Sequence, residues 1–157
     1  MRTDISELAE EYGGRLYALC LRLCGRKEPA DELYQESWLR ILERLDRYRP
    51  DRPFYPWAVK ICVNLYRDGL RREKLRQVLP LEDSLPTAPG PDPDLKLDLD
   101  RAIGMLPEKY KLAVILVYCQ DLPEKEAAAL LRITPGGVKS RLSRAKKLLK
   151  EVLQDDG

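Results

Sequence analysis

Residues 133–147 hold the side chains whose types and spacing are best suited to chemistry, and that chemistry is hydrogen bonding to an anionic partner. Thr134 can cap the first turn of a helix with its hydroxyl, and Pro135 fits the first helical position, where its missing N–H is not needed. No acidic residue occurs in residues 134–150. Donors at the start of such a helix contact base edges and phosphates of duplex DNA. The residues expected to do so are Thr134, Gly136, Gly137, Lys139, Ser140, Arg141, Arg144 and Lys147.

The other side of this segment is apolar, with residues recurring at steps of four, three and four, which places them on one stripe of a helix. The stripe consists of Val138, Leu142, Ala145 and Leu149. A shorter helix is predicted over residues 124–131, because Asp121 and Glu124 resemble a capping box before it. With a turn at residues 132–133, the two helices form a predicted helix-turn-helix.

A second basic helix is predicted over residues 57–74, after a stretch at residues 48–56 in which three prolines favour a loop. Aromatic rings beside cations suit unstacked bases, because every base offers a π-face and every nucleotide a phosphate. Phe54 and Trp57 are explained equally well as core residues. The candidate contact residues are Phe54, Tyr55, Trp57, Lys60, Asn64, Arg67, Asp68 and Arg71.

An acidic helix is predicted after Pro29. DNA would repel such a face, so we expect it to dock on a protein. Its candidate contact residues are Asp31, Glu32, Gln35, Glu36 and Trp38. The alternative is an enzyme that acts on nucleic acid through Asp31, Glu32 and Glu36 with a divalent metal, and acid spacing alone leaves that alternative open.

Four cysteines and no histidine limit the metal and redox chemistry of the chain. Cys20 and Cys24 lie one helical turn apart, but there is no C-x-x-C pair. A cysteine in an intracellular helix is usually a small buried apolar residue. We therefore expect no metal and no cofactor, and a redox role of Cys20 and Cys24 stays an open alternative.

The chain has 157 residues, of which 44% are apolar, and its net charge is only +2. Helical periodicity throughout predicts an all-α fold with two small helical domains, residues 1–76 and 95–157, joined by a proline-rich acidic linker at residues 77–94. No run is long and apolar enough to cross a bilayer, and the first residues contain no signal-type apolar segment. We therefore expect a cytoplasmic protein without membrane insertion.

Four motifs follow one another along nearly the whole chain. They are ADELYQESW at residues 30–38, FYPW at residues 54–57 with Ile61 and Asn64, Leu106-Pro107, and GVKSRL at residues 137–142 with Arg144 and Ala145. In this order they resemble the extracytoplasmic-function (ECF) sigma factors of bacterial RNA polymerase. Four collinear motifs are more specific than a helix-turn-helix alone.

The resemblance implies an amino-terminal domain, sigma region 2, that binds the polymerase clamp and opens the minus-10 promoter element. It implies a carboxy-terminal domain, sigma region 4, that reads the minus-35 element and touches the polymerase flap. Glu32 and Gln35 take the positions of clamp-binding residues, and the loop at residues 54–56 would hold a flipped base. Asn64, Arg67, Asp68 and Arg71 would contact the minus-10 element. The candidate DNA-binding residues within residues 134–147, named in the first paragraph, would contact the minus-35 duplex.

The partners that the resemblance implies are core RNA polymerase, promoter DNA and an anti-sigma factor, without a small-molecule substrate or an enzymatic activity. Three positions depart from the family pattern. Glu32 stands in place of Asp, Gly137 in place of Thr and Ala127 in place of Ile. The alternative within DNA binding is a helix-turn-helix regulator that never meets the polymerase clamp. That alternative leaves the amino-terminal motifs unexplained.

Overall fold

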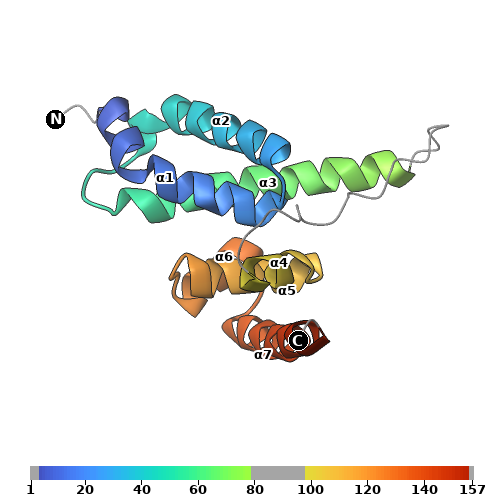
Figure 1. Cartoon of the computed structure of the whole chain (residues 1–157). Helices are drawn as coiled ribbons and strands as arrows, with labels where there is room; N and C mark the ends of the chain where they lie inside the picture. The colour runs from blue at the N-terminus through green and yellow to red at the C-terminus, as the bar shows by residue number, and fades with distance from the viewer. Residues whose placement is uncertain (1–3, 79–97, 156–157) are drawn as a thin grey trace. The chain divides into compact units, whose positions relative to one another are not determined.

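The structure is a computed structural model, and it describes residues 4–78 and 98–155 (Figure 1). Every regular element within these ranges is helical, and none of them is a strand. The chain divides into two compact units, the first holding most of α1 with α2 and α3, and the second holding α4 to α7. The predicted all-α fold is confirmed. Most of the predicted linker at residues 77–94 lies outside the described residues, whereas Gln77 and Val78 belong to the end of α3.

The first unit is built from α1 (Ile5–Cys24), α2 (Lys27–Glu43), the short 3-10 helix η1 (Leu45–Arg47) and α3 (Phe54–Val78). One face of α1 is buried, and the helix ends before Gly25, whose φ of 74° suits glycine. The helices meet in a core from which water is excluded. Its fully buried members include Leu16, Leu19, Cys20, Ile41, Val59, Cys62 and Val63.

An aromatic cluster joins the three helices of the first unit around Phe54, which is only 4% exposed. The ring centroid of Phe54 lies 5.2 Å from that of Tyr12 in α1 and 6.2 Å from that of Trp38 in α2. Tyr48 and Trp57 complete the cluster, with centroids 5.5 and 5.9 Å from Phe54. Such pairs contribute beyond the area they bury, so Phe54 fixes the start of α3 against α1 and α2.

The start of α3 corrects a prediction. The helix begins at Phe54 and not at Trp57, so the predicted loop is shorter and Pro56 lies within the first turn. Proline is tolerated there because the first N–H groups of a helix have no partner within the helix. Phe54, Tyr55 and Pro56 therefore form helix and not the loop that was expected to hold a base.

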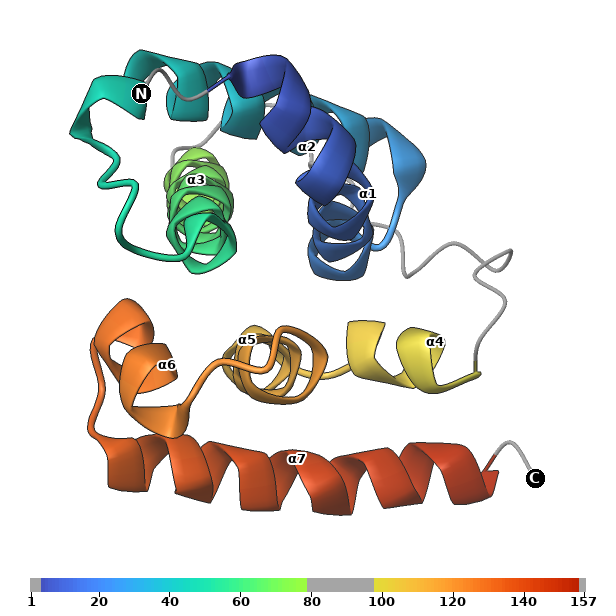
Figure 2. The same ribbon diagram turned by 90° about the vertical axis from the view of Figure 1, so that its left-hand side faces the viewer.

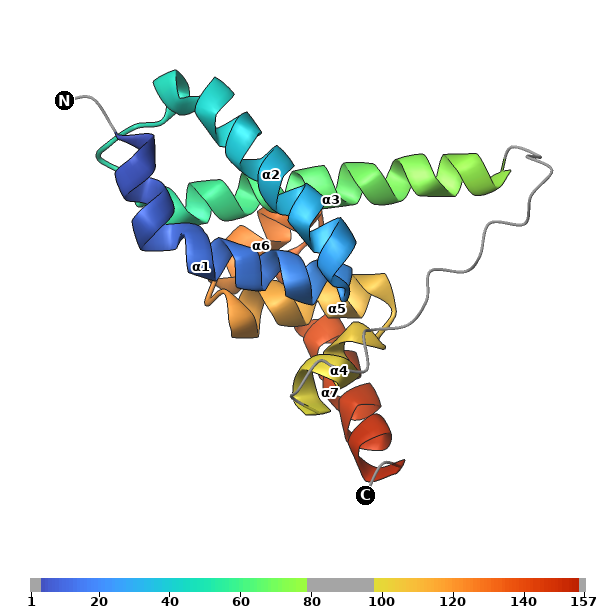
Figure 3. The ribbon, with the colours of Figure 1, turned by 45° about the horizontal axis from the view of Figure 1, so that its top comes forward.

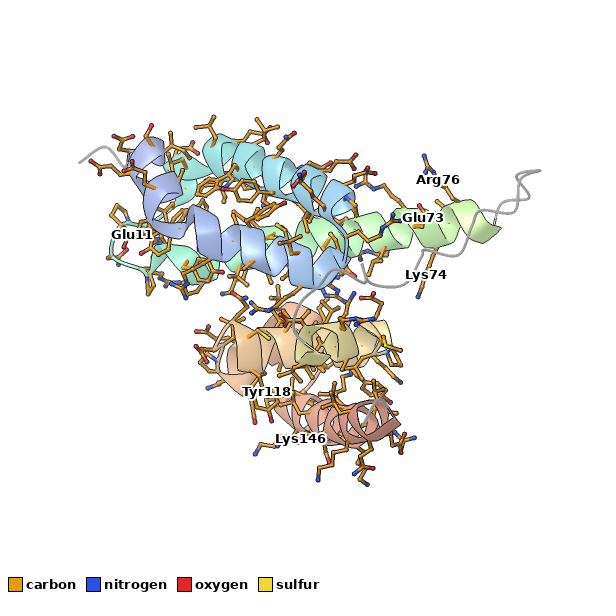
Figure 4. All side chains as sticks on the ribbon, viewed as in Figure 1. Glu11, Glu73, Lys74, Arg76, Tyr118 and Lys146 are labelled. Carbon is orange, nitrogen blue, oxygen red and sulfur yellow. The ribbon has the colours of Figure 1, made fainter. Side chains whose placement is uncertain are left out.

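The last part of α3 runs past the ends of α1 and α2 (Figures 1 and 3). Residues 71–76 are all exposed, and Figure 4 shows Lys74 and Arg76 pointing outward from this end. Ion pairs one turn apart, Asp68 with Arg71 and Glu73 with Arg76, support a helix that has few packing contacts here. The projecting end thus presents cations to solvent.

Two adjacent glycines in α1 predict opposite effects of the same substitution. A Cβ on Gly13 would lie 2.9 Å from the hydroxyl oxygen of Tyr34, whose ring is held edge-on by Tyr17 and Trp38. A Cβ on Gly14 would meet no atom within 4 Å. We expect Gly13→Ala to lower the free energy of unfolding by about 1–2 kcal/mol, and Gly14→Ala to raise it by up to about 1 kcal/mol. Urea unfolding of both variants measures this, and equal effects would contradict the close α1–α2 contact.

The second unit comprises α4 (Asp98–Gly104), α5 (Glu108–Val114), the π-helical turn η2 (Ile115–Cys119), α6 (Glu124–Leu131) and α7 (Pro135–Asp155). In Figure 2, α7 runs along one side of α4, α5 and α6, and it packs against all three. The bounds of α6 and the start of α7 agree with those predicted. The π-helical turn was not predicted.

The predicted capping box before α6 is wrong. Pro123 occupies the capping position, and no side chain bonds to the first turn there. Asp121 has a φ of 55°, a left-handed conformation that aspartate tolerates because its short side chain can bond locally. Asp121 therefore turns the chain from η2 toward α6 without capping the helix.

Candidate nucleic-acid and protein interfaces

The turn between α6 and α7 is defined by two local features. Arg132 caps the carboxyl end of α6 in the left-handed conformation, with a φ of 60°. The hydroxyl oxygen of Thr134 accepts a hydrogen bond of 3.0 Å from the N–H of Gly137, which confirms the predicted cap of α7. The helix-turn-helix geometry predicted from the sequence is thus present.

The two faces of α7 separate as the periodicity predicts. Val138, Leu142 and Ala145 are at most 5% exposed and pack into the second unit. Arg141 is half-buried, and Lys146 lies over the ring of Tyr118, with its Nζ 5.5 Å from the centroid (Figure 4). The exposed polar residues of α7 that the sequence assigns to DNA are Lys139, Ser140, Arg144 and Lys147. They form one continuous outer face, which we call the α7 face.

The glycines at the start of α7 differ in the space around them. A Cβ on Gly136 would come no closer than 3.9 Å to another residue, so this position is open. A Cβ on Gly137 would lie 3.3 Å from the capping oxygen of Thr134 and 3.5 Å from Ile133. A larger residue at position 137 would have to shift the side chain of Thr134 by a few tenths of an ångström. This close contact is a local reason for glycine at a position where the family pattern has threonine.

The outer face of α3 carries the predicted polar residues, but the predicted aromatic residues lie deeper. Lys60, Asn64, Asp68 and Arg71 are exposed, and Arg67 and Trp57 are half-buried. Tyr55 is only 6% exposed, stacks on Tyr12 and is covered by the guanidinium of Arg15, which lies 4.0 Å from its ring centroid. With Phe54 also buried, neither ring offers a free face to a base.

Sequence reasoning did not select the arginines in and beside the loop between η1 and α3, which surround Tyr48. The hydroxyl of Tyr48 donates a 2.8 Å hydrogen bond to the carbonyl oxygen of Arg52, and the N–H of Arg52 bonds to Arg49. We call residues 48–53, which these hydrogen bonds hold together, the tied loop. The side chains of Arg47, Arg49 and Arg52 are exposed in and beside it. The half-buried ring of Tyr48 lies 5.1 Å from that of Trp57. Three arginines within six residues, next to a tyrosine, were the signal in the sequence.

The acidic face of α2 presents Glu32, Gln35 and Glu36 to solvent. Asp31 differs, because it is half-buried and accepts a hydrogen bond from the Tyr17 hydroxyl, which raises the pKa of that tyrosine. Asp31 thus joins α2 to α1. Trp38 is half-buried, and its indole N–H has no recorded partner among the described residues.

A groove of about 500 Å³ adjoins the acidic face, between the start of α1 and the middle of α2. Leu39 and Leu42 extend its apolar lining to the surface and are 61% and 53% exposed, although the sequence analysis did not select them. Their spacing from Gln35, four and seven residues, was the available signal. The groove is lined by Ile5, Ser6, Ala9, Tyr34, Gln35, Trp38, Leu39 and Leu42.

The buried thiols pair across helices. The sulfur of Cys20 lies 3.7 Å from that of Cys62, and the hydrogen bond from Cys20, aided by Ser37, lowers the pKa of the Cys62 thiol. Cys20 therefore faces α3 within the core. Over the described ranges, no three potential ligands gather as a metal site, and no helix there is long and apolar enough to span a membrane.

The comparisons with known proteins match both units. The family model of Sigma-70 region 2 matches residues 8–76, and that of Sigma-70 region 4 matches residues 96–149. The ECF RNA polymerase sigma factor SigE of Mycolicibacterium smegmatis is 30% identical over 156 residues, which cover 94% of this chain and 60% of SigE. SigF of Caulobacter vibrioides is 34% identical over 142 residues, covering 88% of this chain and 79% of SigF.

A solved structure has the same fold. It is the sigma factor RpoE of Bartonella quintana, in complex with the anti-sigma factor NepR, with a TM-score of 0.75 at 23% identity over 97% of this chain and 98% of RpoE. ECF sigma factors are soluble, non-enzymatic initiation factors. The two matched regions, the identity to SigF over most of its length and the shared fold agree with the four motifs, and the chain belongs to the ECF sigma factors of RNA polymerase.

Proposed function

We propose that three surfaces of this sigma factor bind three different partners during promoter recognition. The acidic face of α2, with its apolar groove, docks on core RNA polymerase. The outer face of α3 and the tied loop before it hold the minus-10 element, and the α7 face reads the minus-35 duplex. Phosphate contacts position such a protein and base contacts specify the sequence.

The observation that carries this proposal is the separation of charge. Exposed acids and exposed leucines lie together on α2, whereas the α7 face contains cations and a hydroxyl, and residues 134–150 around it contain no acid. A protein that only binds duplex DNA needs no acidic face beside an apolar groove. No observation favours the helix-turn-helix regulator over the sigma factor, and family membership excludes the metal-dependent enzyme.

The burial of Phe54 and Tyr55 changes their proposed role at the minus-10 element. We assign them to positioning, because Phe54 anchors α3 and Tyr55 is covered on both sides. Tyr48 and Trp57 are the half-buried rings beside exposed cations, so they are the better candidates for stacking on an extruded base. Arg49 and Arg52 then contact the neighbouring phosphates.

Two further proposals concern regulation and place. The solved complex of RpoE with NepR supports the proposal that this chain also has an anti-sigma partner. Such a partner would mask the α2 groove until a signal releases the sigma factor. Because polymerase and promoter DNA are in the cytoplasm, we assign the protein to that compartment.

Binding to sigma-free core polymerase in the absence of DNA tests the proposal against the helix-turn-helix regulator. We expect the full chain to co-elute with core polymerase in size-exclusion chromatography and to be displaced by an excess of another sigma factor. A chain that binds duplex DNA but elutes separately from core polymerase would contradict the proposal, and the regulator would replace it.

A further inference from the structure

Glu124 brings a carboxylate to the edge of a surface that is otherwise cationic. It lies in the first turn of α6, and its Oε2 atom is 3.9 Å from the Nζ of Lys139 on α7. The two side chains are 38% and 72% exposed, so both can reach a ligand. Within residues 98–155, this ion pair joins α6 to α7, the two helices of the helix-turn-helix.

The position of Glu124 is unfavourable for general DNA binding. Residues 134–150 contain no acid, and the cations of the α7 face attract phosphates. A carboxylate beside them repels phosphates and competes for Lys139. An exposed ion pair contributes little to folding. The helix dipole favours a carboxylate in the first turn of α6, but Glu126 already supplies one there, so stability alone does not require Glu124.

The chemistry of base edges offers a reason. Lysine donates to the O6 and N7 atoms of guanine, whereas a carboxylate can only accept, and in the major groove it accepts from the N4 amino group of cytosine. Lys139 and Glu124 together therefore match a site that offers a guanine acceptor beside a cytosine amino donor. Opposite a guanine or thymine edge the carboxylate faces oxygen or nitrogen acceptors and is repelled, whereas adenine, like cytosine, offers it an amino donor.

We propose that Glu124 is a specificity-determining residue of the minus-35 surface. In the free protein its carboxylate binds Lys139. In the complex with DNA the same carboxylate weakens binding to duplexes that place no amino group opposite it. This inference rests on the proposed reading of duplex DNA by the α7 face. It assigns discrimination to repulsion from wrong sequences as well as to attraction to the right one.

The test uses the full chain and a pool of duplexes with a randomised central segment. The duplex enriched by the unmodified protein is compared with a scrambled duplex of the same composition, at several salt concentrations. For Glu124→Gln we expect binding to the scrambled duplex to tighten about 3-fold, and the ratio of the two dissociation constants to fall about 10-fold. Sequencing should show that the enriched G·C preference is lost at one position.

Glu126 provides the matched control, because it lies in the same turn of α6 and is exposed. Glu126→Gln removes the same charge and should leave the ratio of dissociation constants unchanged within about 2-fold. Combining Glu124→Gln with Lys139→Met should restore part of the affinity that Lys139→Met alone loses, because the carboxylate is then no longer unpaired.

Arg144→Ala separates the two levels of the proposal. If this variant weakens duplex binding while Glu124→Gln behaves like Glu126→Gln, the inference on Glu124 is overturned and the DNA-reading α7 face stands. If Arg144→Ala leaves binding unchanged, or the pool yields no enriched sequence, the α7 face does not read DNA and both proposals fall.

Discussion

Replacing Glu32 and Glu36 by lysine is expected to weaken binding of the full chain to core RNA polymerase about 100-fold, because like charges brought together at an interface cost several kcal/mol. Both carboxylates are exposed on one face of α2, four residues apart, so neither substitution disturbs the core. The helix itself should keep its stability, because glutamate and lysine have similar helix propensities. Fluorescence anisotropy of the labelled chain with core polymerase measures the change.

Single substitutions supply the control for this prediction. Glu36→Lys and Glu73→Lys change the charge of the first unit equally, and both side chains are exposed. Glu73 lies on the projecting end of α3 (Figure 4), and it is not one of the residues proposed to dock on the polymerase. Only Glu36→Lys should weaken the complex. Equal effects would show that total charge, and not the α2 face, governs docking.

The double variant Arg144→Ala, Lys147→Ala is expected to weaken binding to promoter duplex by at least about 100-fold, because each charge-assisted bond contributes about 1.5–3 kcal/mol. Both cations are exposed on the α7 face. The slope of log affinity against log salt should also become shallower by about 1.8, because two fewer phosphates are neutralised. Titrations of holoenzyme with duplex at several salt concentrations measure both quantities.

Arg101→Ala with Lys109→Ala is the matched control in the second unit. Both residues are exposed, but they lie on α4 and α5, outside the α7 face. Affinity and salt slope should then stay close to those of the unmodified protein. A loss as large as that of the α7 variant would mean that the charge of the whole unit attracts DNA without a defined reading surface.

Local signals were sufficient to predict the helix-turn-helix. The start of α7 follows from residues close to each other in sequence, namely the apolar period, the Thr134 cap and Pro135 at the first helical position, whereas the bounds of α6 agree although the capping box that indicated them is absent. The exposed polar residues of α3 could be predicted for the same reason, because Ala58, Ile61 and Cys62 mark its buried side.

Contacts between distant parts of the chain could not be predicted in this way. Phe54 is buried because rings from α1 and α2 meet it, and nothing in residues 48–57 alone shows this. The bond from Tyr17 to Asp31 also depends on how α1 packs on α2, and it joins one of the expected docking residues to α1. The ion pair of Glu124 with Lys139 likewise requires two helices in place.

The most direct measurement mixes the full chain with core RNA polymerase lacking any sigma factor and a pool of templates with randomised upstream sequence, and then sequences the transcript starts with their templates. We predict defined starts, preceded by two enriched elements at a constant spacing, that disappear with the Glu32→Lys, Glu36→Lys variant. Starts no more defined than those of core polymerase alone would contradict the central claim that this chain directs promoter-specific initiation.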